Sequence, residues 1–227
     1  MKSIALQATQ SGTRKVMAFI VFEGIDGCGK STQIKLLADF LKSKNIGFIL
    51  TREPGGTPLG EEVRKLLLRT NGEDVPHPRA ELLLYEAIRA QHVEVVIKPA
   101  MNQKKWVISD RFSASTTAFQ SAGRNLKLND IKWLNAYATD GIKPELTILI
   151  DISVSECQKR LSQRNLSTGH DRFEQEEQEF HEKVRLSYLA QAEEDSKGWI
   201  VIDGTTSVSQ IHQQIIDDLI HRNWTTH

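Results

Sequence analysis

A glycine-rich turn followed by a lysine and a serine, near the start of the 227-residue chain, has the residue types and spacing of a phosphate-binding loop. Gly24, Gly29, Lys30 and Ser31 match the pattern G-x-x-x-x-G-K-[ST]. Such a loop turns backbone N–H groups inward, and the helix that follows points the positive end of its dipole at the same place. The lysine would reach the transferable phosphate, and the serine hydroxyl would bind magnesium. The turn therefore predicts a polyphosphate site.

Other polar residues stand directly after apolar runs, where ligands gather in an open α/β sheet. Glu53 belongs to a proline- and glycine-rich loop, 52–58, that follows one such run. Asp110 and Arg111 end another run, where the acid can orient magnesium through water and the guanidinium can clamp a phosphate. A surface ion pair or a helix cap is the alternative for this pair. The segment 203–207 follows a third run, and it either binds the base or caps the last helix.

These residues require strands and helices that alternate along the chain. Short apolar runs bounded by polar or glycine residues predict strands at 18–23, 47–51, 105–109, 146–150 and 199–202. Helical patterns cover 30–44, 59–69, 79–98, 112–121, 129–139, 153–164, 173–195 and 207–222. Strands separated by helices make right-handed parallel crossovers, so we predict an α/β fold with a doubly wound, five-stranded parallel sheet. We expect one domain over 17–227, preceded by a disordered tail, 1–16.

The composition is that of a soluble globular protein, with 39% hydrophobic and 26% charged residues. Lysine plus arginine and aspartate plus glutamate each total 29, so no overall field attracts nucleic acid or an anionic membrane. No apolar run approaches the roughly 18 residues needed to span a bilayer. The two cysteines, Cys28 and Cys157, suggest no disulfide and favour a reducing compartment, so we expect a cytoplasmic protein.

Residues 156–185 are dense in charge, and 165–169 interrupt the helical pattern within them. One interpretation is a mobile lid, about 160–173, that carries arginines over a nucleotide and excludes water when it closes. The other is a solvated helical hairpin whose charges pair four residues apart. The charge pattern by itself favours the hairpin.

Taken together, these residues resemble the thymidylate kinase family, and the match extends over about 19–219. Its most specific parts are 22–33 (Phe-Glu-Gly-Ile-Asp-Gly-Cys-Gly-Lys-Ser-Thr-Gln), 51–57 (Thr-Arg-Glu-Pro-Gly-Gly-Thr) and 110–112 (Asp-Arg-Phe). The Glu-Pro-Gly-Gly loop separates this family from adenylate, guanylate and cytidylate kinases. The resemblance implies a P-loop kinase fold with a mobile lid, and transfer of the γ-phosphoryl group of Mg-ATP to dTMP, which gives ADP and dTDP for dTTP biosynthesis.

The resemblance also implies roles for single residues. ATP would be bound by Gly24, Ile25, Asp26, Gly27, Cys28, Gly29, Lys30, Ser31 and Thr32, with Arg172 and Thr205. dTMP would be bound by Asp26, Glu53, Arg64, Tyr85, Arg89, Arg111, Ser115, Thr116, Phe119 and Gln120. Mg²⁺ would be held by Ser31, Asp110 and Glu53, and the catalytic residues would be Lys30, Asp26, Arg111, Arg160 and Arg164.

Within the acceptor set, the resemblance makes Tyr85 the ring that stacks on thymine and Arg89 the donor to its carbonyl, while Arg64 and Arg111 hold the phosphate. Tyr85 and Arg89 stand four residues apart and so share one helical face. The alternative for this pair is a core tyrosine and a surface arginine.

Two positions depart from the family pattern. Phe119 stands where many members carry tyrosine, so its ring can crowd a ribose 2′-hydroxyl but any hydrogen bond from a phenol is lost. Gly27 stands where some members place an arginine inside the loop. The positive charge that phosphoryl transfer needs would then come from the lid, through Arg160, Arg164 and Arg172, and this turns the balance toward the lid interpretation.

Other functions are less consistent with the chain. It shows no Ser-His-Asp order of a known type and no His-Glu-x-x-His zinc motif, and a phosphate acceptor that is already largely a dianion needs no general base. The rivals are a kinase for another nucleoside monophosphate or a deoxynucleoside, and a nucleotide-switched binding protein, for which an Asn-Lys-x-Asp motif is missing. The resemblance implies a homodimer, formed through helices such as 79–98, with ATP and dTMP as small-molecule substrates and no nucleic-acid or membrane partner.

Overall fold

The computed structural model describes residues 17–69, 75–164, 173 and 176–225. Their centre is a sheet of five parallel strands in the order β2-β3-β1-β4-β5. The strands are β1 (Phe19–Glu23), β2 (Phe48–Arg52), β3 (Trp106–Asp110), β4 (Leu146–Asp151) and β5 (Trp199–Asp203). Each lies within one residue of its predicted bounds, and the predicted doubly wound α/β fold is confirmed.

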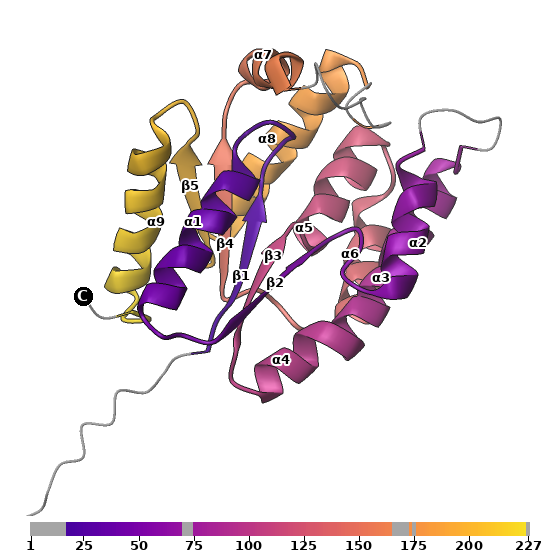
Figure 1. Cartoon of the computed structure of the whole chain (residues 1–227). Coiled ribbons are helices and arrows are strands. Elements are labelled where there is room, and N and C mark those ends of the chain that lie inside the picture. The colour runs from indigo at the N-terminus through magenta and orange to yellow at the C-terminus, as the bar shows by residue number, and fades with distance from the viewer. Residues whose placement is uncertain (1–16, 70–74, 165–172, 174–175, 226–227) are drawn as a thin grey trace, which may run out of the picture.

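Helices cover both faces of this sheet (Figure 1). They are α1 (Lys30–Ser43), α2 (Pro58–Leu67), α3 (Pro78–His92), α4 (Lys98–Asn102), α5 (Ser113–Thr116), α6 (Leu128–Thr139), α7 (Val154–Arg164), α8 (Gln178–Glu194) and α9 (Val208–His221), with π-helical turns η1 (Val93–Ile97) and η2 (Thr117–Gly123). Helices α1 and α9 pack side by side on one face, while α3 packs on α6, and α8 packs on η2 and on β4 and β5.

The central strand β1 explains how the core is divided. All five of its side chains are buried, and successive ones point to opposite faces. Phe19 and Val21 join the smaller apolar cluster, which contains Val93 and Ile97 of η1. Ile20 and Phe22 join the larger cluster, which reaches α1, α8 and α9. Burial on both faces is the reason why this strand reads as a continuous apolar run.

Three predicted helices have different limits in the structure. The helix predicted at 79–98 is a composite of α3, η1 and α4, and it ends at Asn102. Pro99 did not end it, because this proline lies in the first turn of α4, where a missing N–H removes no hydrogen bond within the helix. The helix predicted at 112–121 consists of α5 and η2, and the one predicted at 173–195 begins at Gln178.

Two predictions fall mainly outside the described residues: the tail, 1–16, and the part of the lid beyond α7. Both cysteines are free, as predicted, and both are buried. Among the described helices, none has the length and apolar character required to cross a membrane.

Candidate active site

The predicted phosphate-binding loop joins β1 to α1 and forms the floor of a cavity of about 450 Å³. Gly24 has a φ of +135°, and a Cβ there would lie 2.7 Å from the carbonyl oxygen of Ile150 in β4, so only glycine fits. Gly29 precedes α1 with a φ of +110°, and no described side chain caps this helix end. The first amides of α1 therefore remain available to an anion.

Lys30 is buried and folds back over the loop. Its Nζ donates to the carbonyl oxygens of Gly24 at 2.9 Å and of Ile25 at 3.2 Å, and it lies 3.7 Å from Oδ1 of Asp26. It also lines the cavity. A bound phosphate would offer this ammonium group a charged partner in place of two neutral carbonyls. The lysine therefore already lies close to the expected position of the phosphate.

Asp26 and Arg111 connect the loop to the carboxyl end of β3. Arg111 has a φ of +71°, and its Nη2 lies 2.8 Å from Oδ1 of Asp26. Burial raises the pKa of Asp26, but the charges of Arg111 and Lys30 outweigh burial, so this pKa lies well below its usual value. Asp26 is therefore ionised at neutral pH and ties a cation on each side to the loop.

Glu23 and Tyr188 hold Arg111 in place through hydrogen bonds, and neither was predicted from the sequence. Nη1 of Arg111 donates to Oη of Tyr188 at 2.9 Å, and this hydroxyl donates to Oε2 of Glu23 at 2.8 Å. Glu23 also accepts from Oγ of Ser115 at 2.7 Å and from the amide of Phe112 at 2.9 Å. Burial raises the pKa of Glu23 although Arg111 lowers it. A carboxylate at the end of an apolar strand was a usable signal for Glu23, whereas Tyr188 had none.

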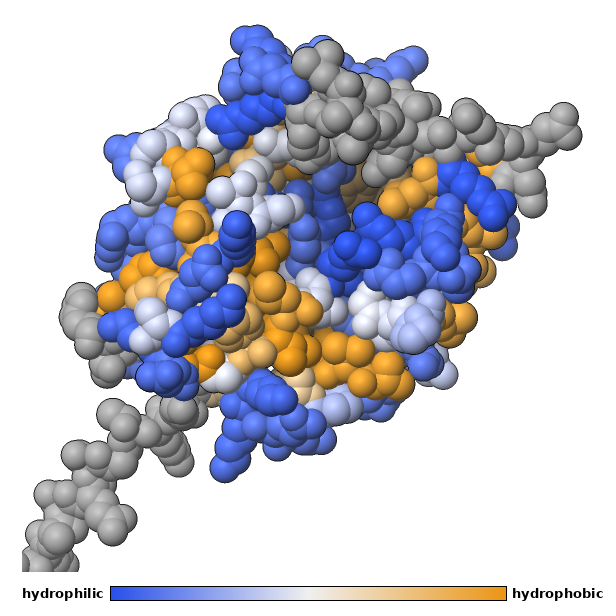
Figure 2. Space-filling model, viewed as in Figure 1, coloured by the Kyte–Doolittle hydropathy of each residue, from blue (hydrophilic) through white to orange (hydrophobic). Residues whose placement is uncertain are grey.

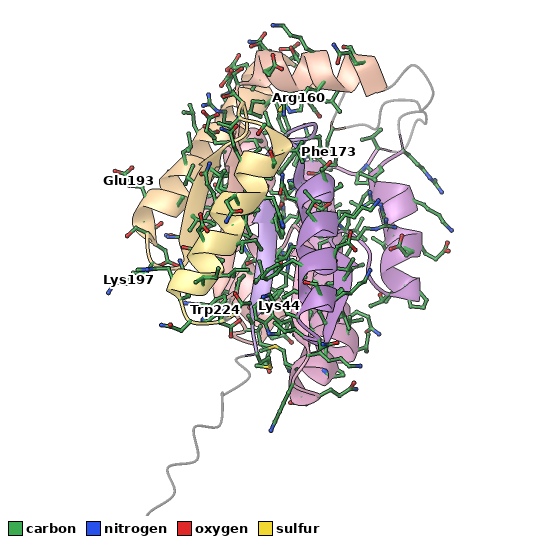
Figure 3. All side chains as sticks on the ribbon, turned by 60° about the vertical axis from the view of Figure 1, so that its left-hand side comes forward. Lys44, Arg160, Phe173, Glu193, Lys197 and Trp224 are labelled. Atoms are coloured by element: carbon green, nitrogen blue, oxygen red, sulfur yellow. The ribbon has the colours of Figure 1, made fainter. Side chains whose placement is uncertain are left out.

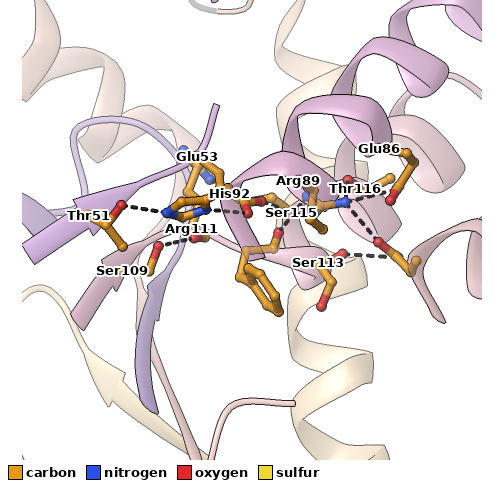
Figure 4. A network of polar contacts seen from close by, with 12 residues as sticks. Thr51, Glu53, Glu86, Arg89, His92, Ser109, Arg111, Ser113, Ser115 and Thr116 are labelled. Carbon is orange, nitrogen blue, oxygen red and sulfur yellow. Dashed lines mark hydrogen bonds and ion pairs between the residues drawn. The ribbon is translucent and has the colours of Figure 1, made fainter. Parts of the chain in front are cut away.

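A second buried network surrounds Glu53 (Figure 4). Its Oε2 accepts from Nε of Arg89 at 2.8 Å, and its Oε1 lies 2.9 Å from Nδ1 of His92. Since a carboxylate only accepts hydrogen bonds, Nδ1 carries a proton. Nε2 of His92 lies 2.6 Å from Oγ1 of Thr51 in β2. Glu53 thus holds the loop after β2 against α3.

Aromatic rings form the wall of the cavity opposite the loop. Tyr85 of α3 and Phe119 of η2 both pack edge-on against Phe173, with ring centroids 6.4 and 5.6 Å apart. The guanidinium of Arg111 lies over Phe119, 5.0 Å from the ring centroid. This wall suits a flat base, and Phe173 is a member that the sequence analysis did not select.

The cavity brings most of the predicted site residues together, between α1 and α2, where Figure 2 shows a hollow with hydrophilic residues. The predicted residues that line it are Asp26, Gly27, Gly29, Lys30, Ser31, Thr32, Glu53, Arg64, Tyr85, Arg89, Asp110, Arg111, Ser115, Thr116, Phe119, Gln120 and Arg160. Lining residues that were not predicted are Arg52, Pro54, Leu68, Leu161 and Phe173.

Four other predicted residues that the structure describes do not line it. Gly24, Ile25 and Cys28 belong to the loop but face the core, and Ile25 and Cys28 are buried there. Thr205 donates through its amide and its hydroxyl to Oδ1 of Asp203, at 2.8 and 2.7 Å. The segment 203–207 is a helix cap in this structure, because Ser207 and Gln210 form a reciprocal capping box at α9.

The charged segment is described only in part. Nη2 of Arg160 donates to the carbonyl of Gly204 at 3.0 Å, and its Nε lies 3.4 Å from Oε1 of Glu156. Figure 3 shows Arg160 and Phe173 at the same end of the molecule. The side chain of Arg164 and the whole of Arg172 lie outside the described residues, so their predicted roles stay predictions.

A divalent cation fits beside the loop in chemical terms. Oδ1 of Asp110 is buried without a hydrogen-bond partner among the described residues, and Ser31 stands in the first turn of α1. The described residues contain no cluster of three or more His, Cys, Asp or Glu arranged for a metal. Mg²⁺ takes one or two carboxylates together with substrate phosphates, which agrees with this sparse set. Both oxygens of Glu53 are engaged by Arg89 and His92, and this leaves it poorly suited to a direct metal bond.

Comparison with known proteins gives a consistent result. The family model described as Thymidylate kinase matches residues 22–215. A thymidylate kinase of Bdellovibrio bacteriovorus is 48% identical over 208 residues, 91% of this chain and 97% of that protein. A thymidylate kinase of a Sulfurihydrogenibium species is 46% identical over 90% of this chain and 98% of its own length. The crystal structure of thymidylate kinase from Ehrlichia chaffeensis matches with a TM-score of 0.72 and 35% identity, covering 90% of this chain and 98% of that one. The chain has a phosphate-binding loop that shares a cavity with the buried Arg89 and the partly buried Arg111. With these relatives, the chain belongs to the thymidylate kinase family.

Proposed function

We propose that the cavity transfers the γ-phosphoryl group of ATP to the phosphate of dTMP, giving ADP and dTDP. Membership of the thymidylate kinase family supports the reaction. The observation that carries the assignment of the site is the 2.8 Å contact between Asp26 of the phosphate-binding loop and Arg111 at the end of β3. Because one residue of this pair belongs to the donor loop and the other to the acceptor side, the two phosphates would meet there.

On the donor side, the amides of the loop and of the first turn of α1 hold the ATP phosphates. Lys30 exchanges its carbonyl partners for the β- and γ-phosphates. When Mg²⁺ is bound, Ser31 and Asp110 would hold it, and it would neutralise phosphate charge. We leave Glu53 out of the metal site, because both of its oxygens are already hydrogen-bonded.

On the acceptor side, Arg111 and Arg64 hold the dTMP phosphate, and the ring of Tyr85 faces the base. Thr116 and Gln120 line the same cavity, and Arg89 supplies a donor to the base. Phe119 bounds the part of the cavity that would hold the sugar, with a ring that carries no hydroxyl. Ser115 supports Arg111 through Oγ, 3.3 Å from Nη1.

The transfer needs positioning and charge more than proton removal. An oxygen of the dTMP phosphate attacks the γ-phosphorus while the bond to the bridging oxygen of ADP breaks, and no proton has to move, because the acceptor is largely a dianion at neutral pH. Arg111 and Lys30 supply positive charge beside the phosphates. Arg160 lines the cavity and, with Arg164 and Arg172, would supply the rest.

We propose a homodimer that acts in the cytoplasm. An exposed apolar surface on α6 supports an interface, since Trp133 and Tyr137 are 66% and 76% exposed and stack with centroids 5.8 Å apart. Leu83 of α3, the helix that packs on α6, is 56% exposed as well. A light-scattering mass of one chain would refute the dimer.

An assay of ADP release with each nucleoside monophosphate tests the function. We expect turnover with dTMP that depends on Mg²⁺, and weaker turnover with dUMP, because one methyl group in a pocket is worth roughly 1 to 3 kcal/mol. Activity with AMP or CMP but not with dTMP would overturn the proposal. ATP hydrolysis at the same rate with and without any monophosphate would indicate a nucleotide-switched binding protein instead.

A further inference from the structure

Arg89, in the cavity wall, makes five hydrogen bonds with described residues. It is buried, and its guanidinium group contacts four elements or loops around it (Figure 4). Nε donates to Glu53 at 2.8 Å, and Nη2 donates to the carbonyl of Phe112 at 3.3 Å. Nη1 lies within 2.9 Å of three acceptors, which are Oε1 of Glu86, Oγ1 of Thr116 and Oδ1 of Asn135.

Counting the N–H groups of the Arg89 guanidinium against their acceptors shows which of them can bind a ligand. Nη1 has two N–H groups and faces three acceptors, so its edge is saturated. Nε has one N–H, and Glu53 accepts it. Nη2 has two N–H groups, and among the described residues one acceptor is recorded for it. The remaining N–H on Nη2 is therefore the one that Arg89, which lines the cavity, can offer to a ligand.

The acceptor on α6 is itself fixed in orientation. Arg89 can only donate, so Asn135 must turn its oxygen toward it. Nδ2 of Asn135 donates to the carbonyl of Ser113 at 3.2 Å, and a carbonyl can only accept. Both ends of the amide are thus determined by their partners. Asn135 therefore presents its oxygen, not its amide nitrogen, to Nη1 of Arg89.

Glu86 lies one helical turn before Arg89 on α3. It is buried, its Oε1 accepts from Nη1 at 2.8 Å, and its Oε2 has no hydrogen-bond partner among the described residues. A half-satisfied buried carboxyl is costly, and Glu53 already supplies the counter-charge for Arg89. The need for a counter-charge therefore does not explain a buried carboxyl at position 86. A role in orienting the guanidinium of Arg89 does explain it.

We propose that Glu86 and Asn135 are positioning residues that fix Arg89 so that Nη2 donates to the C4 carbonyl of the acceptor base. This inference rests on the proposed function. With the dTMP phosphate at Arg111, the base end remote from the sugar reaches the wall that contains Arg89, and C4 is the ring atom opposite the glycosidic nitrogen. Neither Glu86 nor Asn135 lines the cavity, so both act through Arg89.

The test compares dTMP with 5-methyl-dCMP, which keeps the methyl group and the sugar but carries an amine in place of the C4 carbonyl. For Glu86→Ala and for Asn135→Ala we expect a KM for dTMP about tenfold higher, and a preference for dTMP over 5-methyl-dCMP about tenfold smaller. The KM for ATP should stay within about twofold of wild type, because the donor side does not contact either residue.

Three controls complete the design. Glu86→Gln keeps an acceptor oxygen in place and should restore both the KM and the preference. Asn129→Ala changes an exposed asparagine on the same helix as Asn135 and should behave as wild type. Thermal unfolding of each variant separates misfolded protein from a specific defect.

Two outcomes would overturn the positioning role. One is that folded Glu86→Ala and Asn135→Ala keep the wild-type KM and preference. The other is that Glu86→Gln is as defective as Glu86→Ala. Failure of the wild-type enzyme to phosphorylate dTMP would overturn the proposed function instead, and the two failures are therefore distinguishable.

Discussion

The proposed donor and acceptor halves of the cavity differ in the groups that would bind an anion. The donor half consists of backbone amides, a helix end and Lys30, whose carbonyl partner Gly24 stands six residues away. The acceptor half relies on the buried Arg89 and the partly buried Arg111, and several partners of each come from distant parts of the chain. Arg89 pairs with Glu53, 36 residues away, and Arg111 pairs with Tyr188, 77 residues away.

This difference has a physical cause. Amides at a helix end carry a fixed partial charge that folding orients at no extra cost, so a short local sequence is sufficient. A guanidinium on a long side chain must be held by carboxylates and carbonyls, and each buried carboxyl must be satisfied in turn. The donor half should therefore lose function but not stability when it is mutated, whereas the acceptor half should lose both.

Lys30→Ala should give the largest effect on activity. It removes the charged donor to the transferred phosphate, and we expect kcat to fall about 10³-fold. The melting temperature should change little, because the partners of Lys30 among the described residues all belong to its own loop. Steady-state kinetics and calorimetry measure both quantities, with Lys35→Ala, at an exposed lysine of α1, as the control. A melting temperature that falls sharply would remove the distinction between the two halves.

Arg111→Ala should raise the KM for dTMP about 100-fold and leave the KM for ATP nearly unchanged. It should also lower the free energy of unfolding by about 3 kcal/mol, because Glu23 and Asp26 lose their shared cation. Urea unfolding and acceptor titrations report these changes, and Arg79→Ala, at an exposed arginine, serves as the control. An unchanged KM for dTMP would mean that the acceptor half is misplaced.

His92→Leu tests the support of Glu53 at a distance from the substrate. Oε1 of Glu53 and Oγ1 of Thr51 would lose their partner, and this should cost about 1 to 3 kcal/mol of unfolding free energy. The KM for dTMP should rise several-fold, because the loop after β2 lines the cavity. Equilibrium unfolding of His92→Leu is compared with that of His221→Leu, which changes an exposed histidine. Equal stability of the two variants would contradict the supporting role.

Asp26→Asn should lower the free energy of unfolding by a smaller amount, and this amount should depend on pH. The pKa of Asp26 in the folded chain lies below its ordinary value of 3.8, so its ion pairs, chiefly the 2.8 Å pair with Arg111, stabilise the fold above about pH 4. As the pH falls below this value, the unfolded chain takes up the proton first and the stabilisation is lost. The difference in unfolding free energy between wild type and variant should thus be constant from pH 7 to about pH 5 and should shrink below about pH 4. A difference that grows in acid would show that the pKa is raised instead.

Most of the fold followed from the sequence, because its signals are local. Strands buried on both faces read as short apolar runs, and the helix starting at Lys30 showed one apolar face. The two π-helical turns were not predicted, because they continue a helical pattern of hydrophobicity without a break. Phe173 gave no signal either, since an aromatic residue in a charged segment shows no periodicity.

The sequence by itself determined the glycine-rich loop between β1 and α1, the five strands and the family. Glycines at Gly24 and Gly29 and the lysine that follows specify a loop conformation within a few residues, and no other part of the chain is needed to recognise it. The tertiary structure alone decided how Arg89 and Arg111 are held. The bond between Glu23 and Tyr188 joins residues 165 positions apart, and no local pattern records a partner at that distance. Such partners are selected by which helix packs on which edge of the sheet, and only the folded chain contains that information.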